Sequence, residues 1–301
     1  MSQWVRGLLG GAVILFLGAS ASSVEASADP LSVFVSVLPL KSFVESVGGD
    51  RVQVSVMVGP GQSPATYEPT PKQMSQLAES RLYFRVGVPF ENVWIDRLQS
   101  VNPQMMIIDL RKDLPLRTFE AGGAGASHAG HDHVEEHDHG SFDPHVWTSP
   151  PLAKMMAERI RDTLRELDAG NSALYDEGYR RFSAELDSLD ADIRRELADL
   201  PSRRFMVFHP SWGYFAETYN LEQIPIEYEG KEPGAKMLAR VIQIGKEEGI
   251  RVVFVQEQFN ASIAETVARA IGAQVVKVDP LAPDYAANLK RTAAAFATAM
   301  R

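Results

Sequence analysis

The chain has 301 residues, of which 45% are hydrophobic and 23% charged, so it is long enough to form two modest globular lobes. Its formal net charge of −9 at pH 7 argues against a nucleic-acid partner, because phosphate binding needs a basic surface. The absence of cysteine excludes disulfides, thiolate metal sites and a lipidated N-terminal cysteine.

Residues 1–28 have the features of a secretory signal peptide. A short start containing Arg6 is followed by an apolar run at 8–19 and by "ASA" at 26–28, an A-x-A-like cleavage site. An anchoring helix is the alternative, but a membrane span needs about 20 apolar residues. We expect a cleavable signal and a soluble, periplasmic mature protein.

The region after the leader alternates strand-like apolar runs with helix-like stretches. Such alternation predicts βαβ units and a parallel sheet. The four predicted strands are 31–37, 52–58, 81–87 and 105–110. We assign residues 29–168 to an N-terminal α/β lobe.

Residues 120–142 form a Gly/Ala/His/acid segment without apolar periodicity, which indicates an exposed loop. A helix is predicted from the prolines at 150–151 to Gly170. Apolar residues at helical spacing then predict a second helix of roughly 25 residues, ended by Pro201. We interpret 169–200 as a rigid linker between two lobes.

The alternating pattern resumes in a C-terminal α/β lobe, residues 201–301. Its predicted strands are 203–208, 223–228, 250–255 and 273–278, with helices at 211–220, 235–248 and 260–272. The predicted fold is therefore α/β, with two lobes that each contain a roughly four-stranded parallel sheet flanked by helices, joined by a long rigid helix.

Ligands of open parallel sheets bind beyond the carboxyl ends of the strands. His209 and Asp279 each follow a predicted strand there, and His145 stands at the start of a helix. Imidazole and carboxylate suit a borderline divalent ion such as zinc. The residues alone leave a second interpretation open, in which His209 is a hydrogen-bonded strand-end histidine and Asp279 a turn residue.

At these residues the chain resembles the zinc/manganese solute-binding proteins of bacterial ABC transporters, over essentially the whole mature chain. The motifs that carry the resemblance include "YEPTPKQM" (67–74), "DPHVWTSP" (143–150), "FHPSWGYFA" (208–216) and "VDPLAPDY" (278–285). The resemblance implies two α/β lobes with a metal ion between them. It also implies an ABC permease of the inner membrane as partner and a monomeric, non-enzymatic binding protein.

The resemblance implies that His145, His209 and Asp279 are metal ligands. The family usually has a histidine in the loop before "YEPTP", where this chain has Ala65. Gln62, Glu68, water or a histidine of the 120–142 loop are the candidates for the missing fourth ligand. Zn²⁺ is the expected ion, because position 209 is a histidine, and Mn²⁺ or another divalent ion is the alternative.

Five histidines between 128 and 139 suggest a low-affinity metal collector, although a solvated loop that binds metal incidentally is the simpler interpretation. Two other functions remain open. One is a periplasmic metal buffer or chaperone without a cognate permease. The other is a metal-dependent hydrolase with Glu257 as its base, which lacks support from any hydrolase motif. Glu257 is otherwise a candidate hydrogen-bond partner for a ligating histidine.

Overall fold

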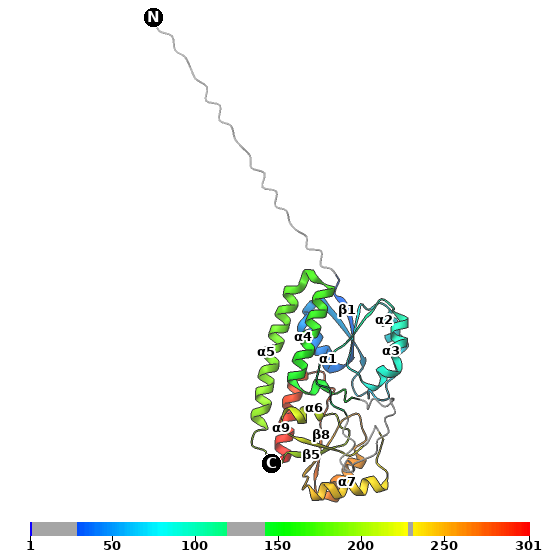
Figure 1. The fold of residues 1–301 in the computed structure, drawn as a ribbon, viewed down its shortest axis with the longest axis vertical. Coiled ribbons are helices and arrows are strands. Elements are labelled where there is room, and N and C mark those ends of the chain that lie inside the picture. Colours follow the sequence, from blue (N-terminus) through cyan, green and yellow to red (C-terminus); the bar gives the residue numbers. More distant parts are fainter. Residues whose placement is uncertain (2–28, 119–141, 228–230) are drawn as a thin grey trace, which may run out of the picture.

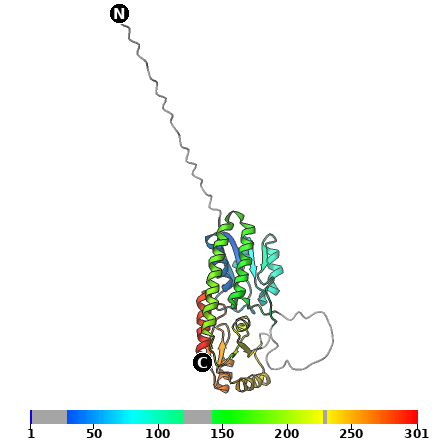
Figure 2. The same cartoon turned by 60° about the vertical axis from the view of Figure 1, so that its left-hand side comes forward.

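The computed structural model describes residues 1, 29–118, 142–227 and 231–301. Two α/β lobes lie one above the other, and long helices run beside them (Figure 1, Figure 2). The predicted signal peptide except Met1, and the predicted histidine-rich loop except Phe142, lie outside the described residues. None of the helices in the described part is long and apolar enough to cross a membrane.

The N-terminal lobe is a parallel sheet of four strands with the order β2-β1-β3-β4. Its central strands, β1 and β3, are rich in valine and aromatic residues and are mostly buried, as expected for a sheet covered on both faces. The strands are β1 (Leu31–Val37), β2 (Val52–Val58), β3 (Leu82–Arg85) and β4 (Met106–Asp109), and the helices are α1 (Leu38–Gly48), α2 (Pro71–Ala78) and α3 (Pro89–Val101).

The C-terminal lobe repeats this topology with the order β6-β5-β7-β8. Alternate residues of β5 and β7 face two different apolar clusters, so both faces of this sheet are covered. The strands are β5 (Arg204–Val207), β6 (Glu222–Pro225), β7 (Val252–Val255) and β8 (Gln274–Lys277), and the helices are α6 (Gly213–Thr218), α7 (Ala235–Glu247) and α8 (Ser262–Ile271).

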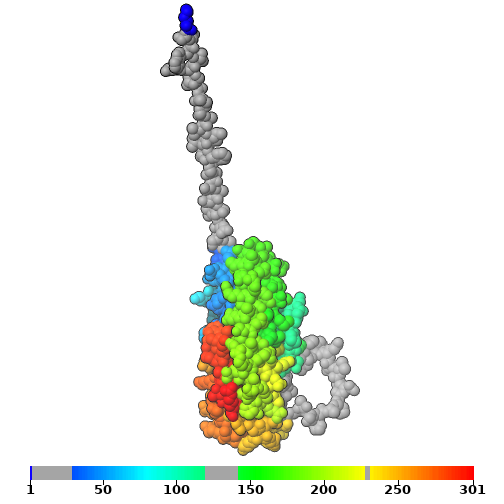
Figure 3. All heavy atoms as spheres, turned by 90° about the vertical axis from the view of Figure 1, so that its left-hand side faces the viewer, coloured from blue at the N-terminus to red at the C-terminus, as the bar shows by residue number. Residues whose placement is uncertain are grey.

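Three further helices connect the lobes. α4 (Pro150–Leu167) packs on α1, and α5 (Ser172–Glu196) packs on α1, α4 and α9 (Tyr285–Met300). Figure 3 shows α5 along the length of the molecule with α9 beside its lower half. One hydrophobic core contains residues of both sheets and of these helices. The lobes are therefore packed against a shared scaffold.

The structure confirms the predicted fold class, including the four parallel strands of each lobe and the long helix between them. Most strands are shorter than predicted. α9 was missing from the predicted elements, although its alanine-rich sequence has high helix propensity. The domain boundaries at 29–168, 169–200 and 201–301 stay a prediction.

In both lobes the order of the strands reverses beside the first strand, at β1 and at β5. Such a reversal opens a crevice at the carboxyl ends of the strands. The loops that follow β2, β3, β5, β7 and β8 contribute to one small cavity between the lobes.

Trp147 and Tyr285 join the segment before α4 to the C-terminal lobe. The Trp147 indole Nε1 donates to the Pro280 carbonyl over 2.7 Å, and the Tyr285 hydroxyl donates to the Trp147 carbonyl over 2.7 Å. Both side chains are almost fully buried. These bonds therefore join the segment that contains His145 to the C-terminal lobe close to Pro280, and both His145 and Pro280 line the cavity.

Tyr285→Phe is expected to lower the free energy of unfolding by about 1–3 kcal/mol, because it leaves the buried Trp147 carbonyl without its donor. Urea unfolding followed by circular dichroism measures this change. Tyr179→Phe is the control, since it keeps the ring beneath the Arg161 guanidinium and should cost much less. Equal losses of unfolding free energy in Tyr285→Phe and Tyr179→Phe would contradict the role assigned to the Tyr285 hydroxyl.

Candidate metal centre

The cavity between the lobes has a volume of about 60 Å³. Pockets that hold organic ligands are much larger, about 300–1,000 Å³, so this cavity suits an ion with a few water molecules. Its walls are mostly apolar, and the imidazoles of two histidines form part of them. The lining residues are Ser63, Pro64, Ala65, Val88, Pro89, Pro144, His145, His209, Gln256, Gln258, Phe259, Pro280 and Leu281.

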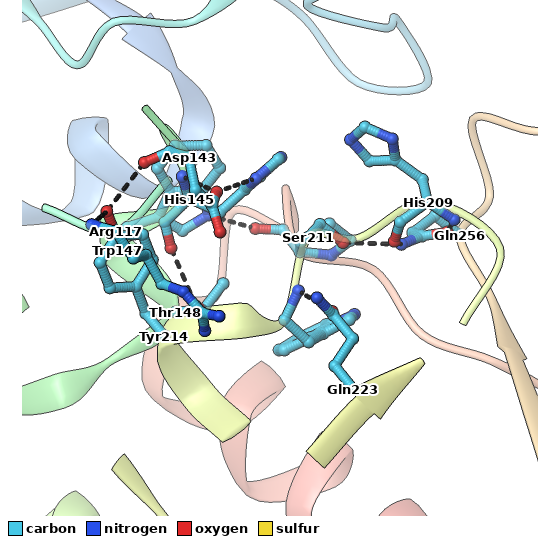
Figure 4. A network of polar contacts seen from close by, with 12 residues as sticks. Arg117, Asp143, His145, Trp147, Thr148, His209, Ser211, Tyr214, Gln223 and Gln256 are labelled. Atoms are coloured by element: carbon cyan, nitrogen blue, oxygen red, sulfur yellow. Dashed lines mark hydrogen bonds and ion pairs between the residues drawn. The ribbon is translucent and has the colours of Figure 1, made fainter. Parts of the chain in front are cut away.

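His145 is held rigidly by the turn that precedes it. The Asp143 carboxylate Oδ1 accepts from the His145 backbone N–H over 3.0 Å and lies 2.7 Å from the ring Nδ1. Asp143 is itself fixed, because the Tyr214 hydroxyl donates to its carbonyl over 2.9 Å (Figure 4). His145 is only 8% exposed, so its ring is locked against the cavity wall.

His209 follows β5 directly and has a matching support. Its ring Nδ1 is hydrogen-bonded to the Oε1 of buried Glu227, and its ring stacks on Phe259 with centroids 5.0 Å apart. Gln256 holds the backbone on both sides: its Nε2 donates to the His209 carbonyl over 2.6 Å, and its Oε1 accepts from the His209 N–H over 3.3 Å (Figure 4). Two contacts therefore fix the ring, and two hydrogen bonds fix the backbone of the same residue.

These contacts define the tautomer that each ring has in its neutral form. A carboxylate only accepts hydrogen bonds, so in that form Nδ1 carries the proton and Nε2 has the lone pair. A carboxylate on the remote nitrogen also raises the basicity of a metal-binding histidine. Asp143 and Glu227 thus prepare both rings to bind a metal through Nε2.

The separation of the two rings fits a single ion. Their centroids lie 5.2 Å apart at an interplanar angle of 74°. Two imidazoles bound to one zinc at about 2.0–2.1 Å and tetrahedral angles would have centroids roughly 5 Å apart. His145 and His209 are therefore placed to share one ion, although 64 positions separate them in the sequence (209 − 145).

Asp279 follows β8 and lies next to the cavity. Its Oδ1 accepts from the Gln258 side-chain Nε2 over 3.0 Å and from the Leu281 backbone N–H over 2.9 Å. Gln258, Pro280 and Leu281 line the cavity, and Asp279 does not. Among the described residues no group of three or more histidines and carboxylates is gathered around one point. The role of Asp279 as a metal ligand stays a prediction.

The loop after β2 places Ala65 in the cavity wall and its two polar neighbours elsewhere. Gln62 and Glu68 are exposed and do not line the cavity, and the Gln62 Oε1 accepts from the Gly59 N–H over 2.8 Å. Gln73 anchors the following helix by donating to the carbonyls of β2. Neither of these fourth-ligand candidates therefore faces the ion position in this conformation.

Sequence reasoning missed Asp143 and Glu227 as histidine partners. It suggested Glu257, but Glu257 is exposed and outside the cavity wall. The available signal for Asp143 was its position in "DPH", two residues before the ring it supports. Glu227 was hidden inside a predicted strand that in fact ends at Pro225.

Burial lowers the pKa of His145 from its ordinary value of 6.5, and the Asp143 carboxylate offsets part of this effect. The unfolded chain therefore binds a proton at a higher pH than the folded chain does. The free energy of unfolding should therefore increase with pH between the lowered pKa of folded His145 and 6.5. It should decrease as the pH falls through the same interval. Unfolding of the metal-free protein between pH 5 and 7.5 measures the slope, and His145→Gln should make it shallower. An unchanged slope in that variant would assign the pH dependence to other groups.

Asp143→Asn should weaken zinc binding about tenfold, because an amide holds the His145 ring less firmly and leaves it less basic. Competition with a fluorescent zinc chelator measures the affinity. Asp187→Asn is the control, because it removes the same charge from an exposed residue of α5. Asp187 pairs with Lys154 away from the cavity, so this substitution should leave the affinity unchanged. Equal affinities of Asp143→Asn and the unmodified chain would exclude a role for Asp143.

The chain matches one protein family over most of its length. The profile of the family described as "Zinc-uptake complex component A periplasmic" matches residues 33–299. A solved structure described as the crystal structure of ZnuA is similar with a TM-score of 0.82 and 39% identity, covering 91% of this chain and 100% of that one.

Two curated proteins are similar over most of the chain. The high-affinity zinc uptake system protein ZnuA of Bacillus subtilis is 27% identical over 261 residues, which are 86% of this chain and 81% of that protein. The zinc-binding lipoprotein AdcA of Streptococcus pneumoniae is 27% identical over 283 residues, which are 91% of this chain but 54% of that protein. The chain thus spans about half the length of the first curated relatives that it matches.

Proposed function

Since the chain belongs to the periplasmic zinc-uptake complex component A family, we propose that it captures a divalent metal ion and delivers it to an ABC permease for uptake. Zinc is the preferred ion in this proposal. The observation that carries this proposal is the pair His145 and His209, each supported by a buried carboxylate and 5.2 Å apart. The family consists of metal-binding proteins of uptake systems and not of enzymes, which sets aside the hydrolase alternative.

The ligand set in this proposal is His145, His209 and Asp279, with the fourth position open beside Ala65. Two imidazoles and one carboxylate with an open position are a normal set for zinc. The two carboxylates behind the rings add negative charge close to the ion. Mn²⁺ prefers oxygen ligands, so with two nitrogen ligands it should bind more weakly than Zn²⁺.

The proposal also includes the oligomeric state of the protein, its location in the cell and its partner. The mature protein is a monomer in the periplasm, released by cleavage of the signal at 1–28, and its permease lies in the inner membrane. The histidine-rich loop acts as a low-affinity collector. A buffer without a permease remains the second candidate, and permease and ATPase genes beside this one would decide for transport.

Calorimetry on a chain that lacks residues 121–140 tests metal capture at the main site. We expect one ion per chain, with Zn²⁺ bound more tightly than Mn²⁺, and affinity that falls as histidines are protonated. The intact chain should take up additional, weaker Zn²⁺ ions. No binding of either ion by the intact chain would refute the proposed function.

A further inference from the structure

Gln258 stands between a predicted ligand and the cavity. It lines the cavity wall, while the carboxylate to which it donates over 3.0 Å, Asp279, does not. The glutamine amide therefore links a residue of the cavity wall to the Oδ1 of Asp279. This contact joins the carboxyl ends of β7 and β8, which are neighbouring strands.

The turn after β7 touches both predicted ligands of the C-terminal lobe. Gln256 and Phe259 hold the backbone and the ring of His209, and Gln258 holds Asp279. The contacts with His209 leave its Nε2 free, because they involve the backbone and the ring face. The contact with Asp279 differs, because it uses a carboxylate oxygen that could otherwise bind the ion.

We propose that Gln258 is a latch for Asp279: it occupies the carboxylate in the metal-free protein and releases it when an ion enters. This inference rests on the proposed function. The exchange replaces one N–H···O bond by one metal–oxygen bond, with no proton transferred. The bond from the Leu281 N–H remains and keeps the carboxylate oriented during the exchange.

The latch lowers affinity by a defined amount. Oδ1 of Asp279 must lose a charge-assisted hydrogen bond before it can bind the ion, whereas without this donor it would need only to turn toward the ion. Such a bond is worth about a factor of ten in affinity. A binding protein that must release its ion to a permease benefits from this competitor, because it limits how tightly the ion is held.

Removing the latch should therefore raise zinc affinity. Gln258→Leu and Gln258→Ala are each expected to tighten zinc binding about tenfold, measured by chelator competition on the intact chain at pH 7. Gln243→Leu on α7 is the matched control, because Gln243 is exposed, bonds Glu247, and should leave the affinity unchanged. Circular dichroism melts identify a variant that fails to fold, and two substitutions of different size guard against a local packing effect.

The same substitutions in an Asp279→Asn background separate a latch from a general effect on the cavity. Without the carboxylate, Gln258→Leu should no longer change the affinity. Weaker zinc binding in both Gln258 variants would overturn the proposal and make Gln258 a support for Asp279. An increase that persists in the Asp279→Asn background would also overturn it.

The outcomes distinguish this inference from the proposed function. If the unmodified chain binds no zinc, the proposed function fails. If it binds zinc, but Asp279→Asn leaves the affinity unchanged, Asp279 is not a ligand: the latch and the assignment of Asp279 to the ligand set fail, while metal capture stands.

Discussion

His145→Ala is expected to weaken zinc binding by at least about a hundredfold. Zinc binding by four protein ligands is worth about 10–16 kcal/mol, so one ligand contributes roughly 3 kcal/mol, or about two orders of magnitude. His145 is buried and its ring is fixed by Asp143, so no neighbouring side chain can easily replace it. His209→Ala should have a similar effect, and the double variant should lose measurable binding at the main site.

Competition with chelators of graded affinity measures these losses. His133→Ala, in the histidine-rich stretch, is the control, and should leave the tightest site unchanged. If His133→Ala weakened the tightest site as much as His145→Ala does, the collector interpretation would be wrong. Melting curves of the metal-free variants confirm that the fold is retained.

Ala65→His should strengthen zinc binding, by about thirty- to a hundredfold. Ala65 lines the cavity that His145 and His209 enter, so an imidazole there would reach the open coordination position. The gain is one ligand of roughly 3 kcal/mol, reduced by the cost of ordering a new exposed side chain. Gln73 of α2 bonds Tyr67 and Thr70 of this loop and the carbonyls of β2. These bonds hold the loop backbone in place, so little chain ordering is needed when the new ligand binds.

Two measurements test this prediction. Zinc affinity is compared with that of Ala65→Leu, which fills a similar volume without a ligand atom and should bind zinc no better than the unmodified chain. The absorption spectrum of the Co²⁺ form reports coordination directly, and azide should change it in the unmodified chain but not in Ala65→His. An azide-insensitive spectrum in the unmodified chain would mean that the protein already supplies the fourth ligand.

Local patterns were sufficient for the architecture. Parallel strands are rich in β-branched and apolar residues, so "LSVFVSV" and "VQVSVMV", which are rich in valine, could be placed to the residue. The histidines at 145 and 209 could also be selected, because ligands of parallel sheets lie at carboxyl strand ends. α9 was missed because its alanines form no strong apolar stripe, although each of them favours a helix.

The two lobes, the approximate positions of their strands and the two histidines as candidate ligands could be predicted from the sequence. The tertiary structure adds that the centroids of the two imidazole rings lie 5.2 Å apart and that Asp143 and Glu227 select the tautomer of the neutral rings. It also shows that Gln258, which lines the cavity, donates to Asp279, which does not. Secondary structure follows from neighbours in the chain, whereas these contacts depend on how two sheets pack across shared helices, which no local pattern encodes.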